Sequence, residues 1–317
     1  MNLKINIILF SLLLLLYSCG SKEFEEVSRF ETFSDNYKSG LYHTLDGIYN
    51  QLNEYKKAYP DKVKLVNIGK SEHFEKMLPF IRIQLGNSET SKQYLFVAGT
   101  HGDEAAAVEA MLFTIDQLLK NNIPVNATID FVLVHNPDGF IENERTNFAG
   151  TDLNRTFPFP SNDVKILTEN KAIMDLVNSN KYKASLFFHT ANEDKYENLI
   201  RVPIEYNQYG TTAFTANAKA DIEKLVSIVQ FANQDNISKV AWHSSSELVN
   251  KNGIASDWCS SGLLNDSVKE LSVNPPKYSH PSLTIELCSP KQPLQVDKLD
   301  EEKKETYNIV LNVIKNI

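Results

Sequence analysis

The sequence predicts a single α/β domain with helices on both faces of a sheet. Short apolar runs alternate along the chain with longer segments whose apolar residues recur at helical spacing, which is typical of this fold class. One run, residues 94–98, is apolar throughout and favours a strand at the centre of the sheet. The chain of 317 residues shows no internal repeat and no evident linker in its folded part, so one domain is the simplest interpretation.

The first predicted elements are one helix and three strands. Apolar residues recur three or four positions apart over residues 42–59 and predict a helix that ends at Pro60. Short, partly alternating apolar runs then predict strands over 63–68 and 80–85, and residues 94–98 form the third.

The rest of the chain continues the alternation of helices and strands. Helices are predicted over 105–119, 164–177, 213–231 and 301–314, and strands over 129–134, 184–188 and 283–285. Because helices stand between most of these strands, we expect them to cover both faces of the sheet.

Residues 1–18 are expected to be a bacterial lipoprotein signal peptide that lies outside the fold. Lys4 precedes an apolar run, residues 5–16, that is short for a membrane span. The following Leu-Tyr-Ser-Cys resembles a lipobox, which implies cleavage before Cys19 and a lipid on that cysteine. The alternative is an ordinary secreted protein in which Cys19 is incidental.

The lipid on Cys19 would anchor the protein to a membrane of the bacterial cell envelope. Residues 19–41 are then the lipidated cysteine and a tether, and residues 42–317 are the folded domain. The acidic stretch at 20–26 fits either a solvated linker or a surface-export signal, so periplasmic and surface exposure both stay open.

Two cysteines remain once Cys19 is acylated. Cys259 and Cys288 could form a disulfide in an oxidising compartment. Their separation in space does not follow from the sequence, so the bridge is left open.

Composition and charge exclude several classes of protein. With 42% hydrophobic and 23% charged residues, the chain is neither disordered nor a disulfide-dense scaffold. Lys and Arg number 32 against 40 Asp and Glu, for a net charge of -8. No basic surface for a polyanion is expected, so nucleic acid is not a predicted partner.

A histidine and a carboxylate stand three positions apart where the predicted central strand ends. The segment 99–104, Gly-Thr-His-Gly-Asp-Glu, lies between a strand and a helix, and sites in α/β sheets gather at such strand ends. His101 and Glu104 can supply two of the three protein ligands of a catalytic zinc, which leaves one position open.

Two other pairs have the same spacing but carry no metal prediction. His43 and Asp46 are expected to be a pair on a helix surface, and His135 and Asp138 to belong to a turn. Such matches arise by chance in an acidic chain with seven histidines.

Further motifs follow the His-x-x-Glu pair. They are Asn-Pro-Asp-Gly at 136–139, an arginine at position 145, Asp-Leu-Asn-Arg at 152–155 and Asp-Trp at 257–258. In this order they resemble the zinc carboxypeptidase family of the carboxypeptidase A/B type, over about residues 42–315. The arginine lies only nine positions before the asparagine of the third motif, a spacing closest to compact bacterial members.

The resemblance implies a mixed, mostly parallel twisted sheet and one zinc ion per chain. The implied zinc ligands are His101, Glu104 and His189, the last of which ends the predicted strand 184–188. A zinc ion held there would polarise a water molecule and the scissile carbonyl group.

The same resemblance assigns the other site residues. Glu286 would take a proton from the water and pass it to the leaving amine, and Arg145 would stabilise charge on the carbonyl oxygen. Asn154 and Arg155 would hold the terminal carboxylate of the substrate. Ser256 stands where the family lines its side-chain pocket, and its small polar side chain predicts neither a strong aromatic nor a strong basic preference.

The motifs leave alternative functions open. The first is a carboxypeptidase that removes one C-terminal residue from peptides, including cell-wall stem peptides. The second is a deacylase of N-acyl amino acids similar to the aspartoacylase and succinylglutamate desuccinylase branch, which shares the zinc set and the Asp-Leu-Asn-Arg segment. Asn-Pro-Asp-Gly and Asp-Trp favour the peptidase. A binding protein without turnover is disfavoured by the intact ligand set, and the sequence does not indicate an oligomeric state.

Overall fold

The computed structural model of the chain describes residues 42–159, 165–190, 199–201, 215–232, 239–241, 253–264, 274–287 and 296–317. The predicted signal peptide, Cys19, the tether and Cys288 lie outside the described residues, so what we expect of them stays a prediction. Within the described part, no helix is both long enough and apolar enough to cross a membrane.

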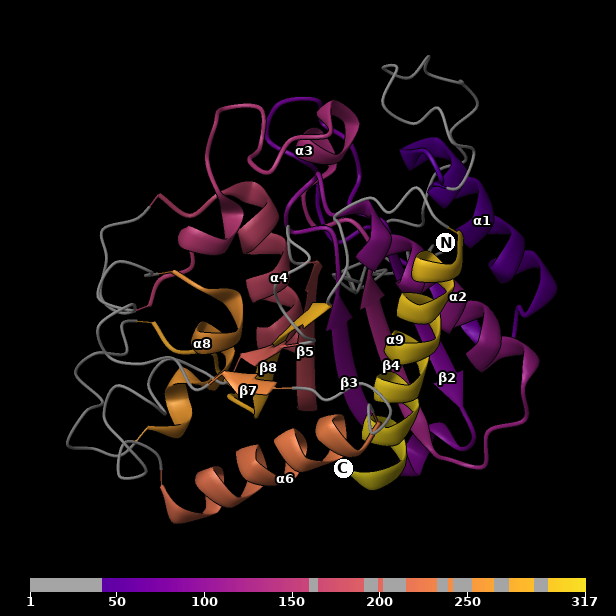
Figure 1. Cartoon of the computed structure of the whole chain (residues 1–317), viewed down its shortest axis with the longest axis vertical. Helices are drawn as coiled ribbons and strands as arrows, with labels where there is room; N and C mark the ends of the chain where they lie inside the picture. Colours follow the sequence, from indigo (N-terminus) through magenta and orange to yellow (C-terminus); the bar gives the residue numbers. More distant parts are fainter. Residues whose placement is uncertain are drawn as a thin grey trace, which may run out of the picture.

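Eight strands of the described residues form one mixed sheet (Figure 1). From edge to edge they are β1 (Val63–Leu65), β2 (Phe80–Leu85), β4 (Ala127–Val132), β3 (Lys92–Val97), β5 (Tyr182–Thr190), β8 (Ser282–Leu287), β6 (Leu199–Arg201) and β7 (Lys239–Ala241). The central strands β4, β3, β5 and β8 are parallel, and β2 and β6 flank them in the antiparallel direction. The predicted mixed, mostly parallel sheet is confirmed.

Helices cover both faces of this sheet. Helix α2 (Ala105–Lys120) connects β3 to β4, and α4 (Thr168–Ser179) precedes β5. Since β4 and β5 lie on opposite sides of β3, right-handed crossovers place α2 and α4 on opposite faces. Helix α9 (Val296–Asn316) packs against α2 and α6 (Ala216–Ala232), as Figure 1 shows.

Helix α1 (Leu45–Ala58) follows directly from its apolar spacing. The side chain of Thr44 caps its first turn by accepting a hydrogen bond from the Gly47 N–H at 2.8 Å. Leu45, Ile48 and Leu52 recur on its inner face and are buried. The helix ends just before Pro60, as predicted.

His43 makes a different contact from the predicted surface pair with Asp46. Its backbone N–H donates to Glu109 Oε1 at 2.6 Å, and its ring Nδ1 lies 2.9 Å from Glu109 Oε2. The hydrogen bond to this buried carboxylate raises the pKa of His43 above its ordinary value. His43 therefore ties the start of α1 to α2, and the expectation of a simple helix-surface pair is wrong.

Four short elements are not predicted by the sequence: β6, β7, α3 (Pro137–Glu142) and α8 (Ala255–Ser260). The Asn-Pro-Asp-Gly segment was expected as a turn, but it begins α3. Asn136 Oδ1 accepts a hydrogen bond from the Gly139 N–H at 2.9 Å, and Pro137 occupies the first helical position. Both residue types favour a helix start at these places, which explains the difference.

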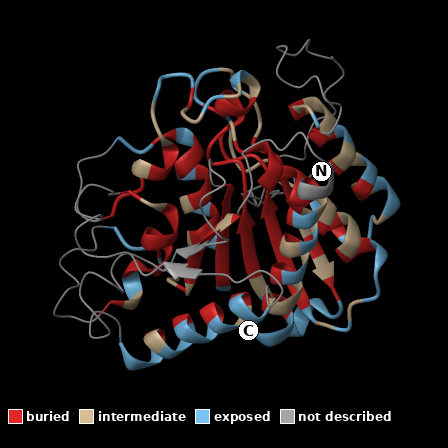
Figure 2. Cartoon of the chain, in the orientation of Figure 1, coloured by how far each residue is buried: buried red, intermediate tan, exposed pale blue. Residues whose placement is uncertain are grey.

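The sheet brings the candidate residues to one edge. Figure 2 shows that the central strands are buried, whereas the outer faces of the helices are exposed. Parallel strands end at the same edge, so the segment after β3 and the ends of β5 and β8 meet there. His101, His189 and Glu286 stand at these three places.

Candidate active site and metal centre

The loop that carries His101 and Glu104 is fixed by a close contact between two glycines. It connects β3 to α2, and Glu104 stands immediately before the helix. A Cβ atom on Gly102 would lie 2.0 Å from the carbonyl carbon of Gly139, so no side chain fits between the two backbones. The His-x-x-Glu and Asn-Pro-Asp-Gly motifs thus pack directly against each other.

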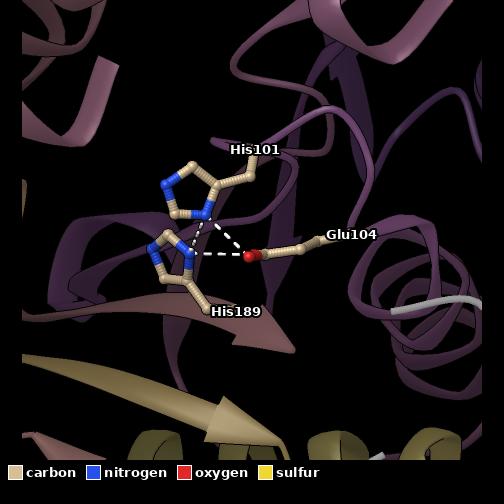
Figure 3. Close-up of side chains that lie close together, drawn as sticks. All are labelled: His101, Glu104 and His189. Atoms are coloured by element: carbon tan, nitrogen blue, oxygen red, sulfur yellow. Dashed lines mark hydrogen bonds and ion pairs between the residues drawn. The ribbon is translucent and has the colours of Figure 1, made fainter. Parts of the chain in front are cut away.

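Three side chains converge beside this loop (Figure 3). His101 Nδ1 lies 2.7 Å from Glu104 Oε1, and His189 Nδ1 lies 2.9 Å from Glu104 Oε2. The two ring nitrogens are 3.1 Å apart. All three residues are buried, with exposed fractions of 2 to 4%.

The charges of this cluster suit a divalent cation. Burial by itself raises the pKa of Glu104, but His189 and His101 outweigh it and hold that pKa well below its ordinary value. For His101, burial lowers the pKa, and Glu104 and Asp152 more than offset it. Glu104 is therefore a carboxylate at neutral pH and offers an anionic oxygen between two imidazoles.

The donor set and its spacing fit a zinc ion. One ligand atom from each residue lies within 4.8 Å of the others, and among the described residues this is the one such group of histidine, cysteine and acidic side chains. Donors about 2.1 Å from a tetrahedral zinc stand roughly 3.4 Å apart, close to the observed spacing. Two imidazoles and one carboxylate are a ligand set that leaves a position open for substrate.

Asp152 holds the outer nitrogen of His101. Its Oδ1 lies 3.2 Å from His101 Nε2, and its Oδ2 accepts hydrogen bonds from Arg145 Nε and Nη2 at 3.1 and 2.9 Å. Burial raises its pKa, but His101 and the two arginines Arg145 and Arg155 together hold it well below its ordinary value. A carboxylate on the second nitrogen of a histidine ligand fixes the ring and its tautomer.

Arg145 lies next to His101, Glu104 and His189, the three candidate metal ligands that we call the ligand cluster. Its Nη1 is 3.3 Å from His101 Nδ1 and 3.8 Å from Glu104 Oε1. The side chain is 41% exposed, so the guanidinium spans from the buried ligands toward solvent. Its contact with Asp152 sets this orientation.

Asn154 and Arg155 belong to a short segment that other parts of the chain hold in place. Asn154 Oδ1 accepts a hydrogen bond from the Ala255 N–H at 3.1 Å. Gly253 has φ +80, and a Cβ atom there would lie 2.3 Å from the carbonyl carbon of Arg155. Asn170 on α4 donates to the carbonyl oxygen of Leu153 at 3.0 Å. The segment is therefore held by contacts with α4, with Gly253 and with the first residue of α8.

Glu286 stands beside a metal-binding candidate. In the parallel ladder of β5 and β8 it is the register partner of His189. Residues paired in this way point to the same face of a sheet, so both side chains lie on the side of the ligand cluster. Glu286 is partly exposed, whereas His189 is buried.

Comparison with known proteins identifies the family. The sequence profile of the zinc carboxypeptidases matches residues 48–309. The chain belongs to the zinc carboxypeptidase family. It is 28% identical over 169 residues to carboxypeptidase M of Mus musculus, covering 47% of this chain and 38% of that relative. The match thus spans well under two thirds of the relative's length.

Solved carboxypeptidase structures share the fold. A metallo-carboxypeptidase from Burkholderia cenocepacia superimposes with a TM-score of 0.65 at 14% identity, covering 86% of this chain and 69% of that one. Bovine thrombin-activatable fibrinolysis inhibitor, solved in complex with tick carboxypeptidase inhibitor, gives 0.64 at 19% identity, with coverages of 86% and 96%. The predicted fold class and family are confirmed, and zinc is the metal that this family and the His-Glu-His group indicate.

The contribution of Asp152 in this member of the zinc carboxypeptidase family was missed by sequence reasoning. It lies in the Asp-Leu-Asn-Arg motif, two positions before Asn154, and that motif was the available signal. Its contact with His101 joins residues 51 positions apart, which no local pattern shows.

We expect Asp152→Asn to weaken zinc binding about 10- to 100-fold, because an amide orients His101 less firmly and lacks the negative charge. Competition with a coloured chelator measures this affinity. Asp175→Asn is the matched control, since Asp175 pairs only with Lys171 on the exposed side of α4 among the contacts described. Equal zinc affinity in the parent and Asp152→Asn would contradict the orienting role.

Ser256 lies on α8 with its hydroxyl turned into the fold. It is 2% exposed, and its Oγ lies 2.9 Å from Thr284 Oγ1 on β8. These contacts do not test the predicted place of Ser256 in the side-chain pocket, which stays a prediction. On the same helix the buried thiol of Cys259 has no disulfide partner among the described residues, which do not include Cys288, and burial raises its pKa to about 12.

Among the described residues, the candidate metal group does not include His135 and Asp138, and both residues are completely buried. His135 Nδ1 lies 3.2 Å from Thr100 Oγ1, and burial lowers the pKa of His135 to about 3. Asp138 accepts hydrogen bonds from the backbone N–H groups of His73 and Phe74. Both residues brace the loops around the site.

Proposed function

We propose that this protein is a zinc-dependent carboxypeptidase that releases the C-terminal residue of a peptide with a free carboxylate. The observation that carries the proposal is the placement of Asn154 and Arg155 beside the ligand cluster. Asp152, two positions before Asn154, contacts the ligand His101 directly. An amide and a planar guanidinium held there suit a terminal carboxylate a short distance from the scissile bond.

The site residues have separate tasks in this reaction. Zinc, when bound, supplies Lewis-acid polarisation of the scissile carbonyl and lowers the pKa of water. Glu286 accepts a proton from the attacking water and delivers it to the leaving amine. Arg145 stabilises negative charge that develops on the carbonyl oxygen, because its guanidinium stays cationic at any working pH.

We further propose a lipid-anchored location in the bacterial cell envelope, with cell-wall stem peptides as a substrate class. The lipobox-like segment before Cys19 supports the anchor, and the compact spacing between Arg145 and Asn154 supports the substrate class. The lipid anchor is independent of the site chemistry, whereas the substrate class rests on the proposed carboxypeptidase reaction.

The variant Arg155→Ala, assayed on matched substrates, tests the proposed binding of the terminal carboxylate. We expect kcat/KM for a free-carboxylate peptide to fall about 100-fold, since a charge-assisted contact contributes roughly 1.5–3 kcal/mol. The same peptide with an amidated C-terminus should lose less than about threefold.

Lys171→Ala on the exposed side of α4 is the control for a lost positive charge. Its two kcat/KM values should match those of the parent. Equal losses of kcat/KM on both peptides with Arg155→Ala would refute the proposed binding of the terminal carboxylate. The N-acyl amino acid deacylase would then be the next candidate.

A further inference from the structure

We propose that His73, Phe74 and Phe148 form an aromatic subsite for the substrate residues that precede the scissile bond. We call these three side chains the aromatic cluster. The proposal rests on the carboxypeptidase function and adds to it a preference for large aromatic side chains one or two positions upstream of the released residue.

His73 and Phe148 of the aromatic cluster are exposed although they stack closely, and Phe74 is half-buried. The rings of His73 and Phe148 are parallel within 5°, with centroids 3.7 Å apart. Phe74 meets Phe148 edge to face at 5.2 Å. Phe148 is nevertheless 53% exposed, so His73 covers only part of its surface. A contiguous exposed aromatic surface of this kind marks a contact site for a ligand.

Both loops of the cluster are held in fixed shapes. The backbone N–H groups of His73 and Phe74 donate to the two carboxylate oxygens of the buried Asp138 at 3.0 and 3.2 Å. On the other loop, Asn147 Oδ1 accepts from the Thr151 N–H at 2.9 Å, which closes a tight turn around Phe148. The subsite is therefore formed before substrate arrives, which lowers the entropic cost of binding.

Phe148 lies close to the reacting groups. Phe148 stands three positions after Arg145, so their Cα atoms are at most about 11 Å apart. Arg145 Nη1 lies 3.3 Å from Nδ1 of the candidate ligand His101. An extended peptide advances about 3.3 Å per residue, so at most about three substrate residues span the distance from Arg145 to Phe148.

The strand order gives the direction of the substrate. The candidate metal ligands lie on the loop after β3 and at the end of β5, and Asn154 is held by α8, which packs on β5 and β8. The aromatic cluster lies toward the other edge, because its first loop joins β1 to β2 and its Asp138 anchor follows β4. Figure 1 shows α3, which carries this anchor, well apart from α8. A peptide held by its carboxylate at Asn154 and Arg155 therefore runs across the ligands toward the aromatic cluster.

Three peptides of equal length test the subsite. They are acetyl-Ala-Ala-X, acetyl-Ala-Phe-X and acetyl-Phe-Ala-X, where X is the residue that the parent releases fastest. For the parent, we expect kcat/KM of the better phenylalanine peptide to be about tenfold higher than that of acetyl-Ala-Ala-X. In Phe148→Ala this ratio should fall about fivefold. The acetyl-Ala-Ala-X value should change by less than about twofold, because alanine makes little contact with the ring.

Two further variants separate recognition from structure. Phe148→Tyr keeps the stacked ring and should retain the preference. Phe231→Ala removes another exposed phenylalanine, 62% exposed on α6, and should change none of the three values.

Each outcome has a distinct meaning. Equal losses on all three peptides, or an unchanged preference in Phe148→Ala, overturn the aromatic subsite while leaving the carboxypeptidase function intact. A parent that releases no C-terminal residue from any peptide overturns the proposed function and the subsite together.

Discussion

Glu286→Gln should bind zinc with the affinity of the parent and lose turnover by about 10³-fold, since general acid–base catalysis contributes roughly 10²–10⁴. The amide keeps the shape of the side chain but cannot accept a proton from water. Glu286 is the register partner of His189 and lies on the same face of the sheet, but it is not one of the three candidate metal ligands, so zinc affinity should not change.

The measurement combines zinc content with single-residue release from a free-carboxylate peptide. Glu301→Gln serves as the control, because it removes an exposed carboxylate on α9 and should leave both values unchanged. Full activity in Glu286→Gln would exclude a proton-transfer role for this residue.

His189→Ala should lower the affinity for zinc at least about 100-fold, because it removes one of the three proposed protein ligands. Nearly all activity should be lost with the zinc. The remaining His101 and Glu104, three positions apart in one loop, offer two donors, and the candidate group contains no other side chain of the described residues. Added zinc should also raise the Tm of the parent but not of the variant, because only a ligand that binds the folded state stabilises it.

His73→Ala is the matched control for this metal measurement. His73 is exposed and bonds through its backbone to Asp138 rather than to the ligands. Its zinc affinity should equal that of the parent. Retained zinc binding in His189→Ala would contradict the assigned ligand set.

The long elements of the fold could be predicted because their patterns are local. Helix α1 has a cap, an apolar stripe and a proline stop within one segment, and β3 contains most of the continuous apolar run at residues 94–98. Strands β6 and β7 have three residues each, too few to show a period. They owe their form to pairing along the edge of an existing sheet, which no local pattern contains.

The candidate site also has features that the sequence predicts and features that only the folded structure shows. The His-x-x-Glu pair and the Asn-Pro-Asp-Gly segment can be recognised in the sequence as motifs. Their mutual contact through Gly102 and Gly139 depends on the tertiary structure. The role of Asp152 and the pairing of His43 with Glu109 likewise join distant parts of the chain. Only the folded sheet brings these partners together.

The most direct test of the account is mass spectrometry of products formed by the purified, zinc-loaded protein, with and without a chelator. The substrates are a pool of peptides, cell-wall stem peptides and N-acyl amino acids. We predict chelator-sensitive loss of single C-terminal residues from free-carboxylate peptides and much slower loss from their amidated forms. Release of acyl groups alone, with every peptide left intact, would contradict the carboxypeptidase function.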